Sequence, residues 1–162
     1  MTNEHLATYL NDHLAGSVVA LELLEQLEAT HAGKPIADFF SQLRADISAD
    51  REELETLMGR LQIAEGRTRK ASAWLAEKIT ELKLRLDDST AGDLRLFESL
   101  EALSLGIEGK RSLWLALSVA AKETAALGLL DYDRLKQRAE EQRGRVEAMR
   151  LETAKTALAL AP

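Results

Sequence analysis

The sequence of 162 residues predicts an all-α fold, a bundle of two antiparallel helical hairpins that a long crossover joins. Three observations support this prediction. Ala, Leu, Glu and Arg are abundant and Pro occurs only twice, a composition that favours helix. Apolar residues recur three or four positions apart through four long segments, as on one face of a helix. No segment shows the alternating pattern between turn residues that is typical of a strand.

Composition narrows the class of protein further. With 46% hydrophobic and 30% charged residues, the chain has enough apolar surface for one domain over residues 1–162. The absence of Cys excludes disulfides and thiolate metal sites. A net charge of -6 argues against nucleic acid and anionic membranes as partners. We find neither a membrane-length apolar run nor a signal peptide, so we expect a cytoplasmic protein.

The first predicted helix runs from about Asn3 to His31, and Gly33 marks its end. Ser17 lies within its apolar stripe, and His13 lies about 60° to one side of the stripe. The other stripe positions are leucines: Leu6, Leu10, Leu14, Leu21 and Leu24.

The second predicted helix begins at Pro35, in the first-turn position that proline favours, and continues to about Gln62. Asp50 falls near the centre of its apolar face, with Asp46 and Glu53 at its edge, four residues before and three after. The short link before Pro35 indicates an antiparallel hairpin.

A crossover is expected next. After Gly66 and the basic turn Arg67, Arg69, Lys70, a shorter helix is predicted from about Ala71 to Leu86. The basic turn could bind an anion, but a solvated turn is the simpler interpretation.

The third long helix is predicted from Asp93 to about Gly128 and is apolar on two sides, which is typical of a helix surrounded by others. Glu98, Glu101 and Glu108 form an acidic stripe along it. Buried carboxylates need protons, cations or metal as partners. One apolar side comprises Leu94, Phe97, Leu105, Leu115 and Val119, and the other comprises Leu96, Leu100, Leu103, Ile107 and Trp114.

The last predicted helix runs from about Tyr132 to Leu160, with Asp131 or Asp133 as its cap. Gln142 sits at the centre of its core stripe, with Arg138 and Arg145 beside it. The stripe itself comprises Leu135, Gln142, Val146, Met149, Thr153 and Leu160.

The segments WLAEKITELKLRL, LEALSLGIEGKRSLWLAL and AEEQRGRVEAMRLETA resemble a bacterial branch of the ferritin-like four-helix-bundle superfamily. In metal-binding members, the first and third helices each supply a Glu, and the second and fourth each supply a Glu-x-x-His pair. Carboxylate and imidazole ligands together suit iron or manganese.

This chain departs from that ligand pattern on every helix. The second helix carries Asp50-Arg51-Glu52-Glu53, which lacks His, and the fourth carries Gln142-Arg143-Gly144-Arg145 at its centre. One and a half turns later comes Glu147-Ala148-Met149-Arg150, in which Arg150 occupies the His position of the Glu-x-x-His pattern. An arginine cannot ligate a metal and brings a fixed positive charge.

Two arrangements of the polar residues along the seam, where the apolar faces of the four helices meet, therefore compete. In the first, Asp50 and Glu101 pair with Arg145, or the glutamates pair with Arg150, within a buried polar network that fixes helix register. The network members are Asp46, Arg145, Arg150, His13, Ser17 and Gln142. In the second, carboxylates and one imidazole bind iron or manganese, the ligands being His13, Asp50, Glu53, Glu101 and Glu108.

Three classes of function follow from these arrangements. The leading one is a ferritin-like bundle without a di-metal centre and without a cofactor, acting as a structural or interaction protein. The second is a metal-binding or oxidative bundle with altered ligands. The third is a small-ligand binding bundle, which requires an apolar pocket near His13, Gln142 and Trp114. No partner is predicted, and self-association into a homo-oligomer stays open.

Overall fold

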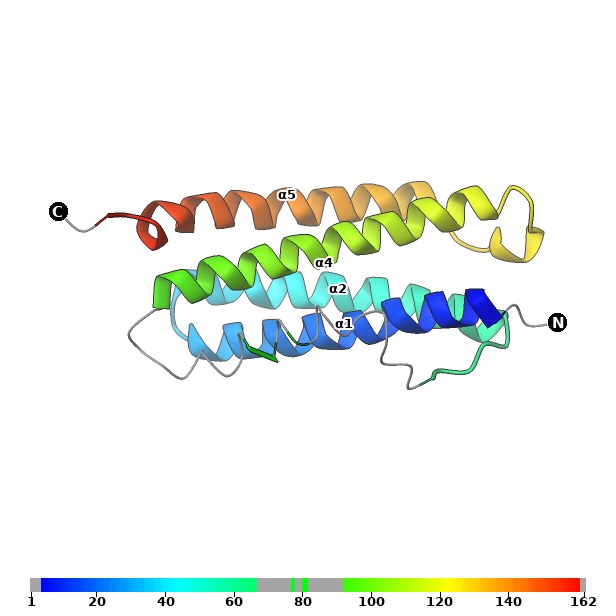
Figure 1. Ribbon diagram of the computed structural model, residues 1–162, viewed down its shortest axis with the longest axis horizontal. Coiled ribbons are helices and arrows are strands. Elements are labelled where there is room, and N and C mark those ends of the chain that lie inside the picture. Colours follow the sequence, from blue (N-terminus) through cyan, green and yellow to red (C-terminus); the bar gives the residue numbers. More distant parts are fainter. Residues whose placement is uncertain (1–3, 67–76, 78–79, 82–91, 161–162) are drawn as a thin grey trace.

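A computed structural model describes residues 4–66, 77, 80–81 and 92–160. These residues form four long helices and one short 3-10 helix, and they contain no strand (Figure 1). The all-α prediction is thereby confirmed. None of the described helices is long and apolar enough to cross a bilayer. The elements are α1 (Glu4–Thr30), α2 (Pro35–Arg60), α4 (Gly92–Ala120), η2 (Ala125–Leu127) and α5 (Tyr132–Ala157).

The four helices pack as two hairpins (Figure 1). α1 packs mainly on α2 and α4 mainly on α5, while smaller contacts join α1 to α4 and α2 to α5. Gly33 makes the first turn possible, because its φ of 80° lies in the left-handed region that other residues avoid. α2 ends at one end of the bundle and α4 begins at the other.

The end of α2 is held against α1 by a buried amide. Gln62 adopts a φ of 55°, and the Ile63 N–H turns back to the carbonyl oxygen of Met58 at 2.9 Å. The Asn11 side chain then donates to the Ala64 carbonyl at 3.2 Å and accepts from the Gly66 N–H at 2.6 Å. One side chain of α1 thus satisfies two backbone groups of the segment that follows α2.

The predicted end of the third helix is wrong. The helix stops at Ala120 rather than near Gly128, and the chain passes through a turn and η2 before α5 begins. The break lets Leu127 return to the core, where it is buried and its carbonyl oxygen accepts a 2.6 Å bond from the Tyr132 hydroxyl. Asp131 is the N-cap of α5, accepting from the Arg134 N–H at 3.0 Å.

Two apolar clusters fill the interior, one toward each end of the bundle. The first contains Phe40 and Leu103, and the second contains Leu57 and Trp114. Between them lies a layer of buried polar side chains. On α2, Asp50 falls between Ile47 of the first cluster and Leu54 of the second.

The expectation that α4 is buried on both sides is also wrong. Leu100, Leu103, Ile107 and Trp114 are buried on one side. On the other, four apolar side chains are between 40% and 56% exposed: Leu94, Leu105, Leu115 and Val119. A four-helix bundle offers each helix only two neighbours, which leaves part of its circumference unpacked. Leu160, expected in the core of the last helix, is 94% exposed beyond the end of α5.

Two further predictions fall on the crossover. The helix predicted over 71–86 lies outside the described residues except for Glu77, Thr80 and Glu81. The basic turn at 67–70 lies wholly outside them.

Removing the α5 cap tests the link between the two elements. Asp131→Ala should lower the free energy of unfolding by about 1 kcal/mol, because the Arg134 N–H loses its acceptor. Asp131→Asn keeps an acceptor oxygen and should stay close to the parent in urea denaturation. Equal losses in both variants would show that the carboxylate charge, and not capping, is responsible.

Candidate functional site

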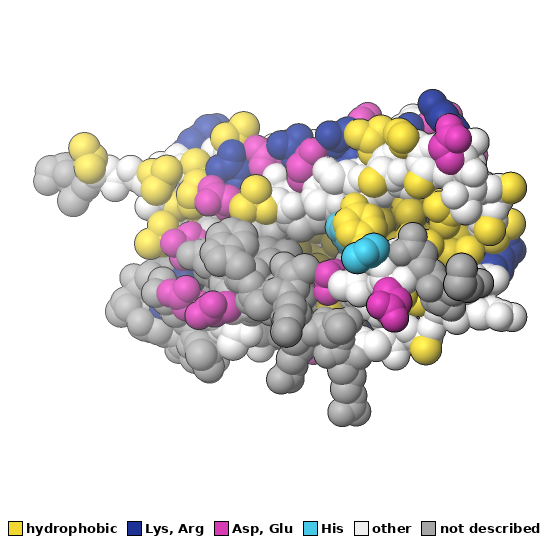
Figure 2. Space-filling model, turned by 45° about the vertical axis from the view of Figure 1, so that its right-hand side comes forward, with side chains coloured by type: hydrophobic (Ala, Val, Ile, Leu, Met, Phe, Trp, Pro, Cys, Tyr) yellow, Lys and Arg dark blue, Asp and Glu magenta, His cyan; other side chains and the backbone are white. Residues whose placement is uncertain are grey.

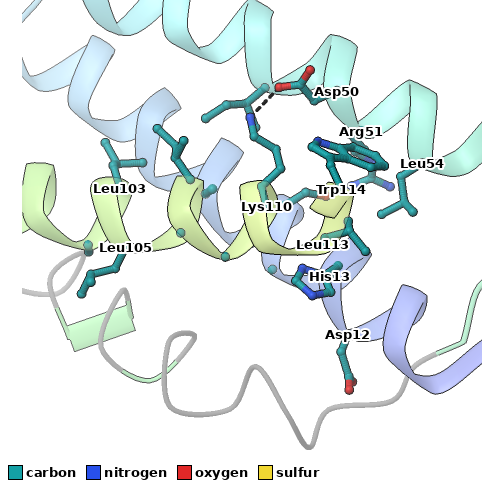
Figure 3. Close-up of a pocket in the computed structure, with 18 of the residues that line it drawn as sticks. Asp12, His13, Asp50, Arg51, Leu54, Leu103, Leu105, Lys110, Leu113 and Trp114 are labelled. Carbon is teal, nitrogen blue, oxygen red and sulfur yellow. Dashed lines mark hydrogen bonds and ion pairs between the residues drawn. The ribbon is translucent and has the colours of Figure 1, made fainter. Parts of the chain in front are cut away.

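The polar layer between the two apolar clusters is centred on Asp50 of α2, whose side chain is 2% exposed. Lys110 of α4 reaches across the seam, with its Nζ 2.5 Å from Asp50 Oδ2 (Figure 3). Gln142 of α5, also 2% exposed, donates from Nε2 to the same oxygen at 2.8 Å and accepts from Lys110 Nζ through Oε1. Three helices from both hairpins therefore meet in one closed triangle of hydrogen bonds.

Arg138 of α5 supplies a second positive charge. Its Nη2 lies 3.0 Å from Asp50 Oδ1, close enough for an ion pair but without hydrogen-bond geometry, and Oδ1 has no hydrogen-bond donor in the described part of the chain. The same Nη2 makes a long 3.5 Å hydrogen bond to the Asp46 carbonyl oxygen. The buried carboxylate is thus neutralised by one lysine and one arginine.

Burial sets the protonation chemistry of this triangle. Desolvation lowers the pKa of Lys110 below its ordinary value, and the neighbouring Asp50 carboxylate opposes that shift. Truncating one member of a buried ion pair leaves the other charge uncompensated, which costs more than the pair itself contributes. The triangle therefore strongly disfavours arrangements in which the two hairpins slip relative to each other.

A cavity of about 270 Å³ lies on the other side of Lys110, between α1, α2 and α4 (Figure 3). Its walls are largely apolar. Tyr9 and His13 of α1, Leu54 of α2, and Leu113 and Trp114 of α4 contribute the larger side chains. In Figure 2, hydrophobic side chains gather on the right half of the face shown, below a row of charged side chains at its upper edge.

Small residues on the two facing helices create this space. α1 presents Gly16 and Ala20 one turn apart, and α4 presents Ala102, Gly106 and Gly109 at spacings of four and three. These spacings place each set on one helix face. A Cβ added at Gly16 or Gly109 would meet no heavy atom within 4 Å. At Gly16 and Gly109 the cavity therefore occupies space that a larger side chain would fill.

Trp114 lines the cavity, and its indole carries a buried donor without a partner in the described chain. Its side chain is 1% exposed, and its Nε1 has no hydrogen-bond acceptor among the described residues. A buried tryptophan N–H normally finds an acceptor, and leaving one unmet costs about 1–3 kcal/mol. The described residues therefore leave this donor unsatisfied, and its lack of accessible surface means that it does not face the open space of the cavity.

His13 forms another part of the wall. Its ring packs edge-on against Tyr9, with 4.7 Å between the ring centroids. Burial lowers the pKa of His13 from its ordinary 6.5, and the nearby Asp12 carboxylate partly opposes the shift. The imidazole is accordingly neutral at pH 7, leaving an apolar ring with one donor and one acceptor nitrogen.

The five predicted metal ligands do not come together. Asp50 is enclosed by Lys110 and Arg138, while His13 lies on the cavity wall. Each glutamate instead faces an arginine at the surface: Glu53 with Arg134 at 2.6 Å, Glu101 with Arg150 at 3.3 Å, and Glu108 with Arg111 at 2.8 Å. Within residues 4–66, 77, 80–81 and 92–160, no three His, Asp or Glu side chains are placed to hold a metal ion.

The structure shows different partners for the arginines of the predicted polar network. Arg145 does not reach Asp50 or Glu101 and pairs with Asp46, both side chains being about two-fifths exposed. Arg150 does approach Glu101, and it also binds Glu147 at 3.0 Å. Two expected members stay apart from the Asp50 triangle: Ser17 donates to the carbonyl oxygen of Leu14 at 2.6 Å, and His13 packs on Tyr9.

Sequence reasoning missed Lys110, the partner that matters most. Its signal was available, because Lys110 lies three residues after Ile107 and four before Trp114, within the apolar stripe of its helix. A lysine is almost never fully buried without a partner, so this position predicts a carboxylate on a neighbouring helix. The matching small residues of α1 and α4 were likewise readable, but only once the two helices are known to face each other.

The chain was compared with protein families, curated proteins and solved structures. No family model matches it. No curated protein and no solved structure matches it either. The function must therefore be argued from the polar layer and the cavity themselves.

Removing single cations tests the charge assignments of the polar layer. Lys110→Ala should lower the free energy of unfolding by roughly 3 kcal/mol, because a buried carboxylate keeps only Gln142 and the imperfectly aligned Arg138. Arg145→Ala should cost at most about 1 kcal/mol, because its pair with Asp46 is exposed to solvent. Urea denaturation measures both, and a larger loss for Arg145→Ala would reverse the assignment.

The pKa of His13 predicts a pH-dependent stability. Above pH 6.5 the imidazole is neutral in both folded and unfolded chains and adds no pH dependence. Below 6.5 the unfolded chain binds a proton that the folded chain excludes, so stability falls until the lowered folded pKa is reached. Comparing urea midpoints at pH 7.5 and 5.5, the parent should lose more than His13→Gln. Identical losses would contradict a buried neutral imidazole.

Proposed function

We propose that this chain is a ferritin-like helical bundle that binds a small, mainly apolar molecule in the cavity between α1, α2 and α4. The observation that carries the proposal is the cavity itself, about 270 Å³ of space with largely apolar walls and a neutral imidazole. Pockets with apolar walls and a few polar groups are the usual form of small-molecule sites.

The helix directions support the ferritin-like part of the proposal. The hairpins α1–α2 and α4–α5 are each antiparallel, and α2 and α4 run in the same direction (Figure 1). This is the arrangement that one long crossover produces in ferritin-like folds. The charges of the seam support a bundle without a di-metal centre, since Lys110 and Arg138 bring positive charge to Asp50 where a metal would otherwise do so.

The energetics favour an occupied cavity. The cavity is partly open to solvent, and an apolar molecule that covers its largely apolar walls removes them from water, which is worth roughly 25 cal/mol per Å². Extending Gly16 or Gly109 by one methyl group would fill part of this space without a clash and would improve helix propensity. Glycines at both positions therefore keep open a space that simple substitutions could close. A bound molecule would supply the missing contacts.

Binding of a plain hydrocarbon tests this function. Indane, a two-ring hydrocarbon, should bind and raise the thermal midpoint of the chain in a concentration-dependent manner. Gly109→Leu should abolish that shift, because its side chain extends into open cavity space. Gly144→Leu on α5 is the matched control: it also meets no neighbour, lies outside this cavity, and should leave binding unchanged.

Two outcomes would overturn the proposal. In the first, indane stabilises neither the parent nor the control; in the second, it stabilises Gly109→Leu as much as the parent. Either result would return the chain to the structural or interaction role predicted from the sequence.

A further inference from the structure

We propose that the cavity binds its apolar ligand only while His13 is uncharged, so that mild acid releases the ligand. This inference rests on the proposed binding function and adds the regulation of the same site. Three observations carry it: the place of the imidazole in the cavity wall, the partial exposure of His13, and the pairing of the other charges on the walls.

The imidazole of His13 belongs to the surface that a ligand would cover. His13 lies on α1 and lines the cavity together with Leu54 of α2 and Leu113 of α4 (Figure 3). Its ring packs edge-on against Tyr9, with 4.7 Å between the ring centroids, which limits the directions in which it can turn. A molecule that fills the cavity therefore lies against this ring and removes water from it.

A change of charge on the ring also requires that it exchange protons with solvent. His13 is partly exposed, and its ring partner Tyr9 is 37% exposed. The Nε1 of Trp114 in the same wall, by contrast, has almost no accessible surface. His13 can consequently gain or lose a proton while the bundle stays folded.

An apolar ligand distinguishes the two forms of the ring. Beside a neutral imidazole it covers little charge, whereas beside an imidazolium it displaces the water that solvates the cation, which costs free energy. The ligand therefore binds the neutral form more tightly, and by linkage its binding lowers the pKa of His13. Burial already lowers that pKa in the empty site and acts in the same direction.

Other ionisable groups line the same cavity from α1, α2 and α4. Asp50 pairs with Lys110, and Arg51 pairs with Glu55 at 2.5 Å. Burial raises the pKa of Tyr9, so its hydroxyl stays neutral in acid. Carboxylates, ammonium groups and guanidinium groups ordinarily change charge outside the range from pH 5.5 to 7.5, and imidazole changes charge within it. Acid release is therefore assigned to His13.

Asp12 is the charged neighbour of His13 on α1, and it sets the pH at which release occurs. Its carboxylate favours the imidazolium and raises the pKa of His13, although less than burial lowers it. Figure 3 shows this carboxylate directed away from Trp114 and Lys110, so a ligand on those walls leaves its effect in place. Removing the carboxylate should move release to lower pH.

Indane tests the proposal because it has no ionisable group, so any pH dependence of its binding comes from the protein. Titration calorimetry should show several-fold weaker binding at pH 5.5 than at pH 7.5, with circular dichroism confirming the fold at both. The loss stays below about tenfold, because the pKa of His13 in the empty site lies below its ordinary 6.5.

Two variants make a matched pair for this measurement. His13→Gln keeps a polar side chain without a titrating charge and should bind indane equally at both pH values. His31→Gln is the control: its ring bonds the Leu27 carbonyl oxygen at 2.8 Å outside the cavity, and the variant should keep the pH dependence of the parent.

Nuclear magnetic resonance reports on the imidazole directly. The chain has three histidines, so the loss of one signal in His13→Gln assigns the ring of His13. Saturation with indane should lower the pKa of His13 and leave the other two imidazole signals titrating as in the free protein. Asp12→Asn should lower the pKa of His13 in the empty site, because the opposing carboxylate is gone.

The failures of the two proposals are distinguishable. If indane does not bind at pH 7.5, the binding function itself is overturned. If indane binds equally at both pH values and the His13 signal titrates alike with and without it, the binding function stands and control by His13 is overturned. An equal loss of affinity in His13→Gln would assign acid release to another group and would also overturn that control.

Discussion

The contact between Asp50 and Lys110 is the interaction on which the arrangement of this bundle depends. It joins a helix of one hairpin to a helix of the other, and Gln142 closes the triangle from a third helix. Apolar packing alone tolerates sliding, because leucines exchange neighbours at little cost. A buried ion pair does not tolerate sliding, because any shift that separates the carboxylate from its cation leaves an uncompensated charge in the interior. The two apolar clusters are therefore held in one register by a single polar layer.

The same layer explains why the cavity lies where it does. Lys110 extends toward Asp50 and α5, so α1 contributes no partner to the triangle. At this level α1 carries Gly16 and Ser17, and Ser17 turns its hydroxyl back to its own helix. With Gly109 opposite, no large side chain of the described residues approaches these two positions. The hydrogen-bonded triangle thus joins α2, α4 and α5, whereas the small residues of α1 and α4 leave the cavity on the other side of Lys110.

Charge pairing elsewhere follows the exposed rim. Arg134, Arg145 and Arg150 each cross from α5 to a carboxylate on a neighbouring helix, at surfaces where solvent screens the interaction. Arg150 also lies 5.5 Å from the centre of the Phe97 ring, which shields one face of that aromatic side chain. These pairs contribute complementarity between helices, whereas the buried triangle contributes the specificity.

The sequence by itself determined the four long helices, the Gly33 turn, an aspartate cap at Asp131 or Asp133, and the presence of polar residues at the centre of the α2 and α5 stripes. Helical periodicity, glycine conformation and capping are local properties, so they can be read from neighbouring residues. The break after Ala120 was not readable, because it serves the burial of Leu127 against Tyr132 in the core. Partner choice was not readable either. Asp50 had several cations within reach in principle, and only the packed helices decided that Lys110 and Arg138 approach it while Arg145 meets Asp46. The cavity is likewise a tertiary property, since small residues on α1 and α4 leave a space only where the two helices face each other.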